Sequence, residues 1–156
     1  MSSEVYGNYA HAEGRGNITH GDGSHAEGDY NTSNGDYSHV EGQRNIIFGK
    51  TNNTIGQYSH AEGQENKVYG SYSHAEGHYN AISSDYSHAE GVSCVIPLSD
   101  DHTFCFNGNS NCSYKSNGPG TFNINVEDGL NNVYIGTSSL YELIVDVVKR
   151  YGPVTI

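Results

Sequence analysis

A six-residue motif recurs along the first 91 residues, and it constrains the fold more than any other feature of this chain. Three copies read Tyr-Ser-His-Ala-Glu-Gly and three are close variants. The six copies stand at residues 9–14, 23–28, 37–42, 58–63, 72–77 and 86–91. A motif that returns at a fixed period is typical of architectures in which each copy stacks on the next. We therefore expect a repeat protein.

A seven-residue period underlies the motif. Residues 3–93 divide into 13 units of seven, and the fifth position of each unit is Gly, except at Ser84. Gly at a fixed phase indicates a tight turn or a close backbone approach after a short strand. A helical coiled coil shares this period, but it needs apolar a and d positions and loses about 1 kcal/mol for every Gly within a helix. The period therefore predicts strands.

The third position of each unit indicates which side chains point inward. It is small or β-branched in every unit, from Val5 and Ala12 to Ala89. Side chains alternate across a strand, so the first, third and fifth positions share the inner face and the second and fourth face outward. The predicted outward ladder consists of His11, Glu13, His25, Glu27, His39, Glu41, His60, Glu62, His74, Glu76, His88 and Glu90.

Two kinds of unit alternate, one beginning with Asn and one carrying His-Ala-Glu or His-Val-Glu. One full repeat then spans two units and two strands, which predicts an all-β fold, a parallel β-roll (solenoid) of 14-residue coils over residues 3–93. Each coil offers few inward side chains, and burial contributes only about 25 cal/mol per Å² of apolar surface. A roll this thin needs support, so we expect an obligate oligomer of identical chains.

The spacing of the motif changes once. Successive motif histidines stand two units apart, except that His39 and His60 stand three units apart. If the extra unit stays in the roll as a strand, the later His-Glu units move to the opposite sheet, and if it leaves the roll as a loop, all six stay in one column. Ile46, Ile47 and Phe48 make this stretch apolar, and apolar residues are usually buried. We therefore favour an extra strand and a change of sheet.

The sequence Gly-x-Tyr-Ser-His-Ala-Glu-Gly at 14-residue spacing resembles a known repeat. It is similar to the Hep/Hag (YadA-like) head repeat of trimeric autotransporter adhesins, and to the His-Ala-Glu-Gly arrays in fibre and spike proteins of phages and large DNA viruses. The resemblance covers about residues 3–93. It implies a left-handed parallel β-roll, three copies of which associate side by side into a homotrimer.

The period ends after Gly91, and we expect residues 94–156 to cap the roll and help it trimerise. Alternating aromatic, β-branched and polar residues predict strands at 103–106, 120–126 and 132–136. A capping box begins a predicted helix at 139–151, and Gly-Pro ends it. The apolar stripe of this helix either meets two other chains on a trimer axis or covers its own sheet. The stripe consists of Leu140, Leu143, Ile144, Val147 and Tyr151.

Catalysis finds little support in the sequence. Neighbouring Ser and His side chains point to opposite faces of a strand, and the one nonrepetitive acidic cluster, at 100–102, is interpreted as a turn before a strand. Columns of His and Glu are able to hold Zn²⁺ or Ni²⁺, but a pair repeated on every coil is interpreted as a supporting ladder. We therefore predict no enzyme activity, no cofactor and no dedicated metal site.

Five tyrosines share the seventh position of the Asn-type unit. Stacked in the predicted roll, they form a candidate ligand ridge able to engage sugars. The alternative is that they cover turns or fill the groove between chains. The five are Tyr9, Tyr37, Tyr58, Tyr72 and Tyr86.

Charge and cysteine usage exclude some partners. The net charge of -11, without a cluster of Lys or Arg, argues against nucleic acid. No stretch approaches the roughly 18 apolar residues of a membrane span, so no membrane insertion is expected. Three cysteines, an odd number without C-x-x-C spacing, favour free thiols in a reducing compartment over a disulfide.

These patterns together predict a non-enzymatic structural or attachment protein. The expected role is a trimeric fibre or head module on a virus or phage particle, in contact with a protein or glycan of the host surface. A chain that starts at Met1 without leader, stalk or barrel favours a complete virion component assembled in the cytoplasm. Two alternatives stay open: a fragment of a bacterial trimeric autotransporter adhesin at the cell surface, and a self-processing fibre protein.

Overall fold

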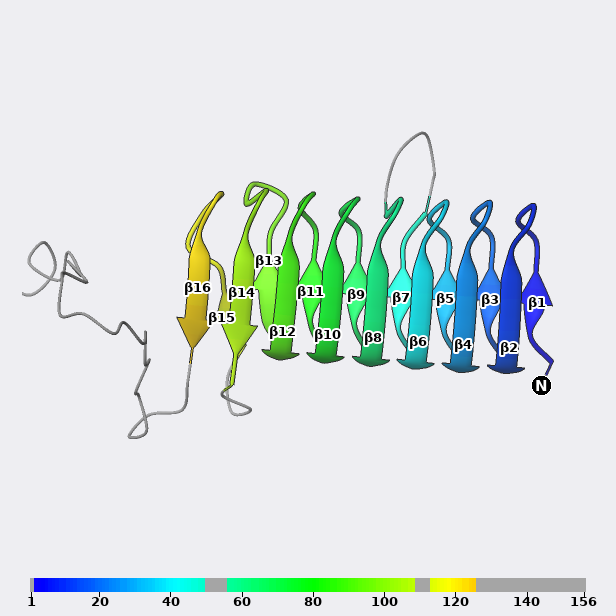
Figure 1. The fold of residues 1–156 in the computed structure, drawn as a ribbon. Helices are drawn as coiled ribbons and strands as arrows, with labels where there is room; N and C mark the ends of the chain where they lie inside the picture. Colours follow the sequence, from blue (N-terminus) through cyan, green and yellow to red (C-terminus); the bar gives the residue numbers. More distant parts are fainter. Residues whose placement is uncertain (1, 50–55, 109–112, 126–156) are drawn as a thin grey trace, which may run out of the picture.

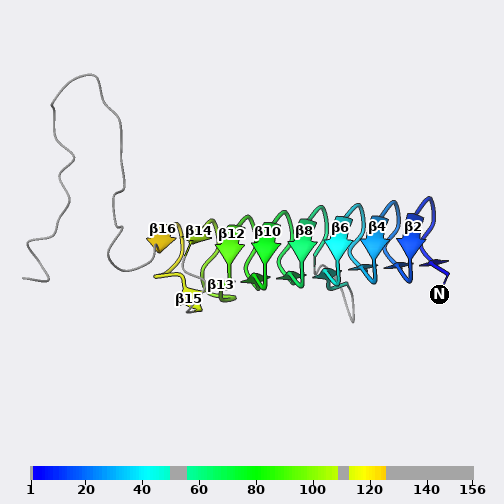
Figure 2. The ribbon, with the colours of Figure 1, turned by 90° about the horizontal axis from the view of Figure 1, so that it is seen from below.

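Two parallel β-sheets lie face to face along the whole described chain (Figure 1, Figure 2). The structure is a computed structural model that describes residues 2–49, 56–108 and 113–125. Each sheet has eight strands, and the chain alternates between them, so that odd-numbered strands form one sheet and even-numbered strands the other. The described residues thus form a β-solenoid of about eight turns, as the repeat predicts, and they contain no helix. Accordingly, no described segment is a helix that is long and apolar enough to cross a membrane.

The two sheets differ in strand length. We call them the short-strand sheet and the long-strand sheet. The short-strand sheet consists of β1 (Glu4–Val5), β3 (Ile18–Thr19), β5 (Thr32–Ser33), β7 (Ile46–Ile47), β9 (Lys67–Val68), β11 (Ala81–Ile82), β13 (Cys94–Ile96) and β15 (Tyr114–Lys115). The long-strand sheet consists of β2 (His11–Arg15), β4 (His25–Asp29), β6 (His39–Gln43), β8 (His60–Gln64), β10 (His74–His78), β12 (His88–Val92), β14 (Phe104–Asn107) and β16 (Phe122–Asn125).

The strands pair in register with the motif. His74 of β10 lies beside His60 of β8 on one side and beside His88 of β12 on the other, and Ala75 and Glu76 have equivalent neighbours. Each coil therefore places the same residue type above the same residue type at a 14-residue interval. This pairing confirms the predicted 14-residue, two-strand coil.

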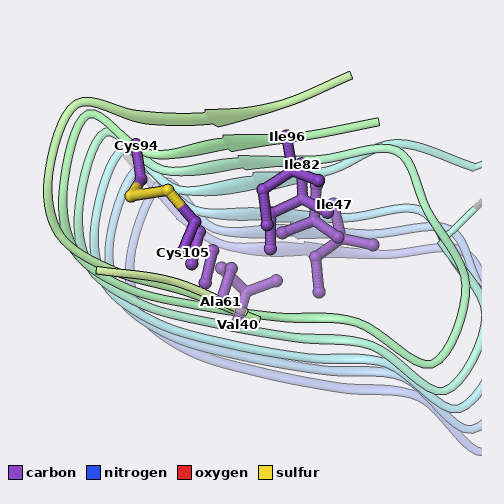
Figure 3. Close-up of a cluster of buried hydrophobic side chains, with 10 residues drawn as sticks. Val40, Ile47, Ala61, Ile82, Cys94, Ile96 and Cys105 are labelled. Carbon is purple, nitrogen blue, oxygen red and sulfur yellow. A yellow bond between two sulfur atoms is a disulfide. The ribbon is translucent and has the colours of Figure 1, made fainter. Parts of the chain in front are cut away.

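The core is a thin row of side chains between the two sheets (Figure 3). Third-position residues such as Val40, Ile47 and Ile82 are fully buried, and so are the first-position asparagines among the described residues: Asn17, Asn31, Asn45, Asn66 and Asn80. The predicted inward direction is therefore confirmed for the first and third positions over most of the roll. It is wrong for the fifth-position glycines that end the motif, because Gly28, Gly42 and Gly63 are exposed at the surface of the long-strand sheet. Val5 differs, with 48% of its surface exposed, because β1 is an edge strand of its sheet and pairs only with β3.

Buried asparagines connect successive coils through hydrogen bonds. In the middle of the roll, the Asn45 side-chain amide donates to the backbone carbonyls of Glu41 (2.6 Å) and Gly63 (2.8 Å), and its Oδ1 accepts from the backbone N–H of Asn66 at 2.8 Å. The same pattern repeats along one column, at Asn17, Asn31, Asn45, Asn66 and Asn80. Buried polar groups that are all paired hold neighbouring coils at a fixed offset.

The motif glycines mark places where two coils touch through their backbones. Gly77 has a φ of 102°, and a Cβ placed on it would lie 2.2 Å from the carbonyl oxygen of Gly91 on the next coil. A side chain at this position meets both a strained backbone conformation and a backbone atom that cannot move alone. This contact explains why Gly recurs at the end of each Ser-His-Ala-Glu-Gly motif.

The change of spacing does not move the motif to the other sheet. β6 pairs directly with β8, with His39 beside His60, and β7 pairs directly with β9, with Ile47 beside Val68. No strand stands between either pair, so all the motif strands remain in one sheet and the predicted extra strand is wrong. The apolar residues that suggested it belong to the regular coil, because Ile47 is a core residue of β7 and the Phe48 ring stacks on Tyr69 at 4.0 Å.

The solenoid extends beyond residue 93, where the sequence period ends. β13 and β15 continue the short-strand sheet, and β14 and β16 continue the long-strand sheet. The strands expected at 103–106 and 120–126 are observed as Phe104–Asn107 and Phe122–Asn125. The strand expected at 132–136 and the helix at 139–151, with its stripe from Leu140 to Tyr151, lie outside the described residues.

A disulfide joins the two sheets near the end of the described roll. Cys94 of β13 and Cys105 of β14 are both fully buried and are bonded to each other (Figure 3). The prediction of free thiols is therefore wrong for these two residues, and Cys112 lies outside the described residues. Cys94 occupies the inward position that Asn80 holds one coil earlier, which brings its sulfur into the core.

Candidate functional site

The motif histidines form one continuous column on the outer face of the long-strand sheet. Their rings stack from His25 to His88 with centroids 4.7–4.8 Å apart, and His11 meets His25 edge-on at 5.1 Å. The 14-residue register of the strands dictates this arrangement, since each histidine is the first residue of its strand. All the predicted ladder residues therefore lie together on one face.

The glutamates of the motif run beside the histidine column and meet it between coils. From His39 onward, each histidine approaches the glutamate of the preceding coil: His60 Nε2 lies 3.6 Å from Glu41, and His74 Nε2 lies 3.4 Å from Glu62. His11 lies 3.6 Å from the glutamate of its own strand, Glu13. We call this surface, from His11 to Glu90, the His-Glu column.

Burial keeps part of the column uncharged. Loss of solvent lowers the pKa of His60 below its ordinary value, and the adjacent His74 and His39 act in the same direction. Burial likewise lowers the pKa of His88, with His74 contributing. The nearby carboxylates oppose these shifts without reversing them. At neutral pH these imidazoles are therefore neutral, with a lone pair available on one ring nitrogen.

Two shallow grooves follow the column of glutamates and glycines. One has a volume of 440 Å³ and runs from Glu13 and Gly14 to Glu41 and Gly42. The second has a volume of 450 Å³ and is lined by Glu62, Gly63, Glu76, Gly77, Glu90 and Gly91. Because glycine has no side chain, the carboxylates line grooves that are open to solvent. Sequence reasoning missed these grooves because it placed the fifth-position glycines of the motif on the inner face, whereas they are exposed.

The tyrosines of the candidate ligand ridge form a second column, at a corner of the roll. The rings of Tyr37, Tyr58, Tyr72 and Tyr86 stack at 5.0–5.2 Å, and His102 continues the stack at 5.0 Å. Each of these five residues has a φ between 53° and 60°, so the turn itself directs the ring outward. All four tyrosines are more than half exposed.

Tyr9 is separated from the other members of the ridge. It lies two coils before Tyr37, and the coil between them carries Gly23 at the equivalent turn. Tyr9 is 99% exposed and has no stacking partner among the described residues. The structure thus brings together four of the five predicted tyrosines.

The acidic cluster at residues 100–102 forms a turn before β14, as predicted. Asp100 is buried, and its carboxylate accepts hydrogen bonds from the Ser116 hydroxyl (2.5 Å), the Ser99 hydroxyl (2.8 Å) and the Gly118 backbone N–H (3.1 Å). These hydrogen bonds, of which the one from Ser116 has the largest effect, lower the pKa of Asp100 below its ordinary value. A fully bonded carboxylate has no free position for a substrate, so Asp100 fixes the shape of the last coils.

Sequence reasoning missed the way in which the columns continue past residue 93. Phe104 and Phe122 follow His88 in the histidine column, and Phe106 follows Glu90. The available signal was the alternation of Phe104-Cys105-Phe106-Asn107, which matches His88-Ala89-Glu90-Gly91 position by position. The match is difficult to recognise in the sequence because residues 104–107 do not follow residues 88–91 at the 14-residue interval of the repeat.

Comparison with known proteins assigns the chain to no group. No family model matches the sequence, and no curated protein matches it.

Proposed function

We propose that this chain is a non-enzymatic structural and attachment module, three copies of which form a fibre or head on a virus or phage particle. The observation that carries the proposal is the in-register stacking of the Tyr-Ser-His-Ala-Glu-Gly repeat into a solenoid with continuous outward columns. Such a roll presents the same chemical groups many times along one axis. The resemblance to Hep/Hag heads and to viral His-Ala-Glu-Gly fibres supports the same assignment, with left-handed winding and side-by-side trimers.

The thinness of the core supports self-association. The hydrophobic cluster consists of small or medium side chains such as Ala61, Ala75 and Val68, with one row of them between the sheets. A core of this size contributes little stabilisation by burial, so neighbouring chains would supply the remainder. Sedimentation equilibrium of the purified chain tests this point. The expected mass is that of a trimer at micromolar concentration, and a monomer that melts cooperatively at the same concentration contradicts it.

The tyrosine ridge is the surface that we assign to attachment. Exposed rings stacked about 5 Å apart offer flat apolar faces at regular intervals, which suits contact with sugar rings or with a protein surface. A glycan array with the assembled protein is expected to give signals that disappear when Tyr58 and Tyr72 are replaced by Ser. Equal signals from the wild type and this variant would remove the ridge from the proposal.

Association with a particle is the most direct test of the biological role. Mass spectrometry of purified virions or phage particles is expected to detect this chain in stoichiometric amounts. Its absence from particles, together with its recovery from a bacterial surface fraction, would favour the second candidate, an adhesin fragment. The Cys94–Cys105 disulfide fits both candidates, because disulfides persist in oxidising surroundings such as cell surfaces and virion exteriors.

A further inference from the structure

The His-Glu column contains polar atoms that the described residues do not satisfy. Nε2 is buried and without a hydrogen-bond partner in the histidines of five successive coils: His25, His39, His60, His74 and His88. In four of them, from His39 to His88, Nε2 lies between 3.4 Å, for His74 and Glu62, and 4.0 Å, for His39 and Glu27, from a carboxylate oxygen of the preceding coil. These separations exceed the roughly 2.7–3.2 Å of a normal N–H···O hydrogen bond. A buried polar atom left unpaired in each coil calls for a partner.

The observed separations are those of two atoms bound to one metal ion. A zinc ion binds imidazole nitrogen and carboxylate oxygen at about 2.0–2.2 Å, so two ligands at a tetrahedral angle lie about 3.4 Å apart. In the triad Glu62, His74 and Glu76, one ligand atom from each residue lies within 4.8 Å of the others. Small side-chain rotations therefore suffice to close such a triad around an ion.

We propose that the His-Glu column binds divalent transition-metal ions, Zn²⁺ in the first place, in sites made of one histidine and the glutamates of two neighbouring coils. Four such triads follow one another, ending with Glu76, His88 and Glu90. A fifth, at the first coil, has two histidines and one glutamate: His11, Glu13 and His25. This proposal does not depend on the chain being trimeric.

The donor set selects the class of ion. Imidazole nitrogen suits zinc, copper and nickel, whereas sites of carboxylate alone suit magnesium and calcium. A site with one neutral imidazole and two carboxylates balances the charge of a divalent cation.

Each site leaves room for a further ligand. Three protein donors leave the fourth tetrahedral position of zinc open, as in zinc sites that bind water or an external group. The groove lined by Glu62, Gly63, Glu76 and Gly77 runs beside the triad of His74 and is open to solvent. The fourth ligand is therefore water or a donor group presented from outside the roll.

Neighbouring triads share carboxylates, which limits how many ions bind. Glu41 belongs to the triads of both His39 and His60, and the two rings are 4.8 Å apart. Two dications at this spacing would repel each other and compete for one carboxylate. At most three triads share no residue with one another, for example those of His11, His39 and His74, so we expect no more than three ions per chain.

The test begins with the full chain, stripped of metal by a chelator and dialysed against Zn²⁺. Metal analysis is expected to show saturation at no more than three Zn²⁺ per chain. Zinc-edge X-ray absorption is expected to show imidazole nitrogen together with carboxylate oxygen in the first shell. A large excess of Mg²⁺ is expected to leave the zinc bound. Failure to bind Zn²⁺, a first shell of oxygen alone, or displacement by Mg²⁺ would each overturn the proposal.

A pair of variants assigns the binding to this column. Replacing His39, His60, His74 and His88 by Gln keeps every carboxylate and is expected to abolish binding at their triads. The matched control replaces His20, His78 and His102 by Gln, the three histidines that belong to none of the triads, and is expected to bind as the wild type does. Undiminished binding by the fourfold variant contradicts the proposal. If that variant does not fold, X-ray absorption of the control variant decides, because imidazole in its zinc shell must then come from the remaining histidines.

Discussion

The coils up to β12 and the coils from β13 onward have the same backbone path but are held together differently. In the first region, equivalent motif residues stack at a 14-residue interval except between His39 and His60, and buried asparagines bind each coil to the next. In the second region, the intervals in the long-strand sheet lengthen, first between His88 and Phe104 and again between Phe104 and Phe122. There the motif residues are absent, and the Cys94–Cys105 disulfide and the hydrogen bonds of the Asp100 carboxylate connect the coils instead.

The outer face changes at the same boundary. The column occupied by His and Glu as far as β12 continues with Phe104 and Phe106, and then with Phe122 and Ile124. Phe104 and Phe122 stack at 4.7 Å, a spacing close to that of the histidines before them. The solenoid backbone therefore does not require the motif. The motif is required for the polar column on the outside and the asparagine ladder on the inside.

The largest expected effect comes from glycine in the repeat region. Gly77→Ala places a methyl group 2.2 Å from the Gly91 carbonyl oxygen at a φ of 102°, and we expect it to lower the free energy of unfolding by about 4 kcal/mol or more. Urea denaturation followed by circular dichroism measures the loss.

The matched control lies in the second region. Gly120 also has a positive φ, 65°, but a Cβ placed on it meets nothing within 4 Å. Gly120→Ala is therefore expected to cost only about 1 kcal/mol, the price of the backbone conformation alone. If Gly77→Ala and Gly120→Ala lower the free energy of unfolding equally, close backbone contact between coils is not what distinguishes the two regions.

The asparagine ladder should give the next largest effect. Asn45→Ala leaves three buried groups unpaired: the carbonyls of Glu41 and Gly63 and the N–H of Asn66. Each such group costs about 1–3 kcal/mol, and because water and relaxation compensate part of this cost we expect a loss of about 3–4 kcal/mol, near the lower end of the sum. The control, Asn8→Ala, changes an exposed side chain and should alter stability by less than about 0.5 kcal/mol. Thermal and urea melts of both variants measure the difference.

The repeat region could be predicted from sequence because its rules are local. A fixed Gly phase and a small third position indicate which residues face inward, and Ala26, Ala61 and Ala75 are indeed fully buried. The outward direction of His and Glu follows from strand alternation. The pairing of His74 with the glutamate of the preceding coil does not follow from it, because that depends on side-chain rotations between coils.

Two of the wrong predictions, the extra strand and the free thiols, arose where a general tendency did not apply to a particular arrangement. Ile46, Ile47 and Phe48 suggested an extra buried strand, yet the core position of Ile47 and the stacking of Phe48 on Tyr69 account for these residues within one ordinary coil. The odd number of cysteines and an assumed reducing compartment suggested free thiols. Continuing the seven-residue frame would have placed Cys94 in the core, but only the fold shows that Cys105 faces it.

Loss of the disulfide should lower stability less than loss of the asparagine ladder does, and only in the second region. The loop between Cys94 and Cys105 is short, and closing such a loop contributes about 3 kcal/mol. Reduction of the wild type, or the double change Cys94→Ser and Cys105→Ser, is expected to speed amide hydrogen exchange in β13–β16 while β4–β8 stay protected. The double variant is the control for the reductant, which should have no further effect on it. Uniform loss of protection along the roll would contradict this local role.

Acidification should give the smallest effect, confined to the repeat region. The pKa values of His60 and His88 are lowered in the folded protein by burial, whereas in the unfolded chain they return to about 6.5. Between these values the unfolded state binds more protons, so the stability is complete above about pH 6.5 and declines as the pH falls below it. The facing carboxylates Glu41 and Glu76 reduce the effect, and the half-exposed rings reduce it further.

Amide hydrogen exchange of the metal-free protein measures this effect. Protection of β8–β12 from exchange, relative to β14 and β16, is expected to fall between pH 7 and pH 5, because Phe104 and Phe122 cannot take up a proton. A greater loss in β14 and β16, or a gain of stability on acidification, would reverse the comparison between the two regions.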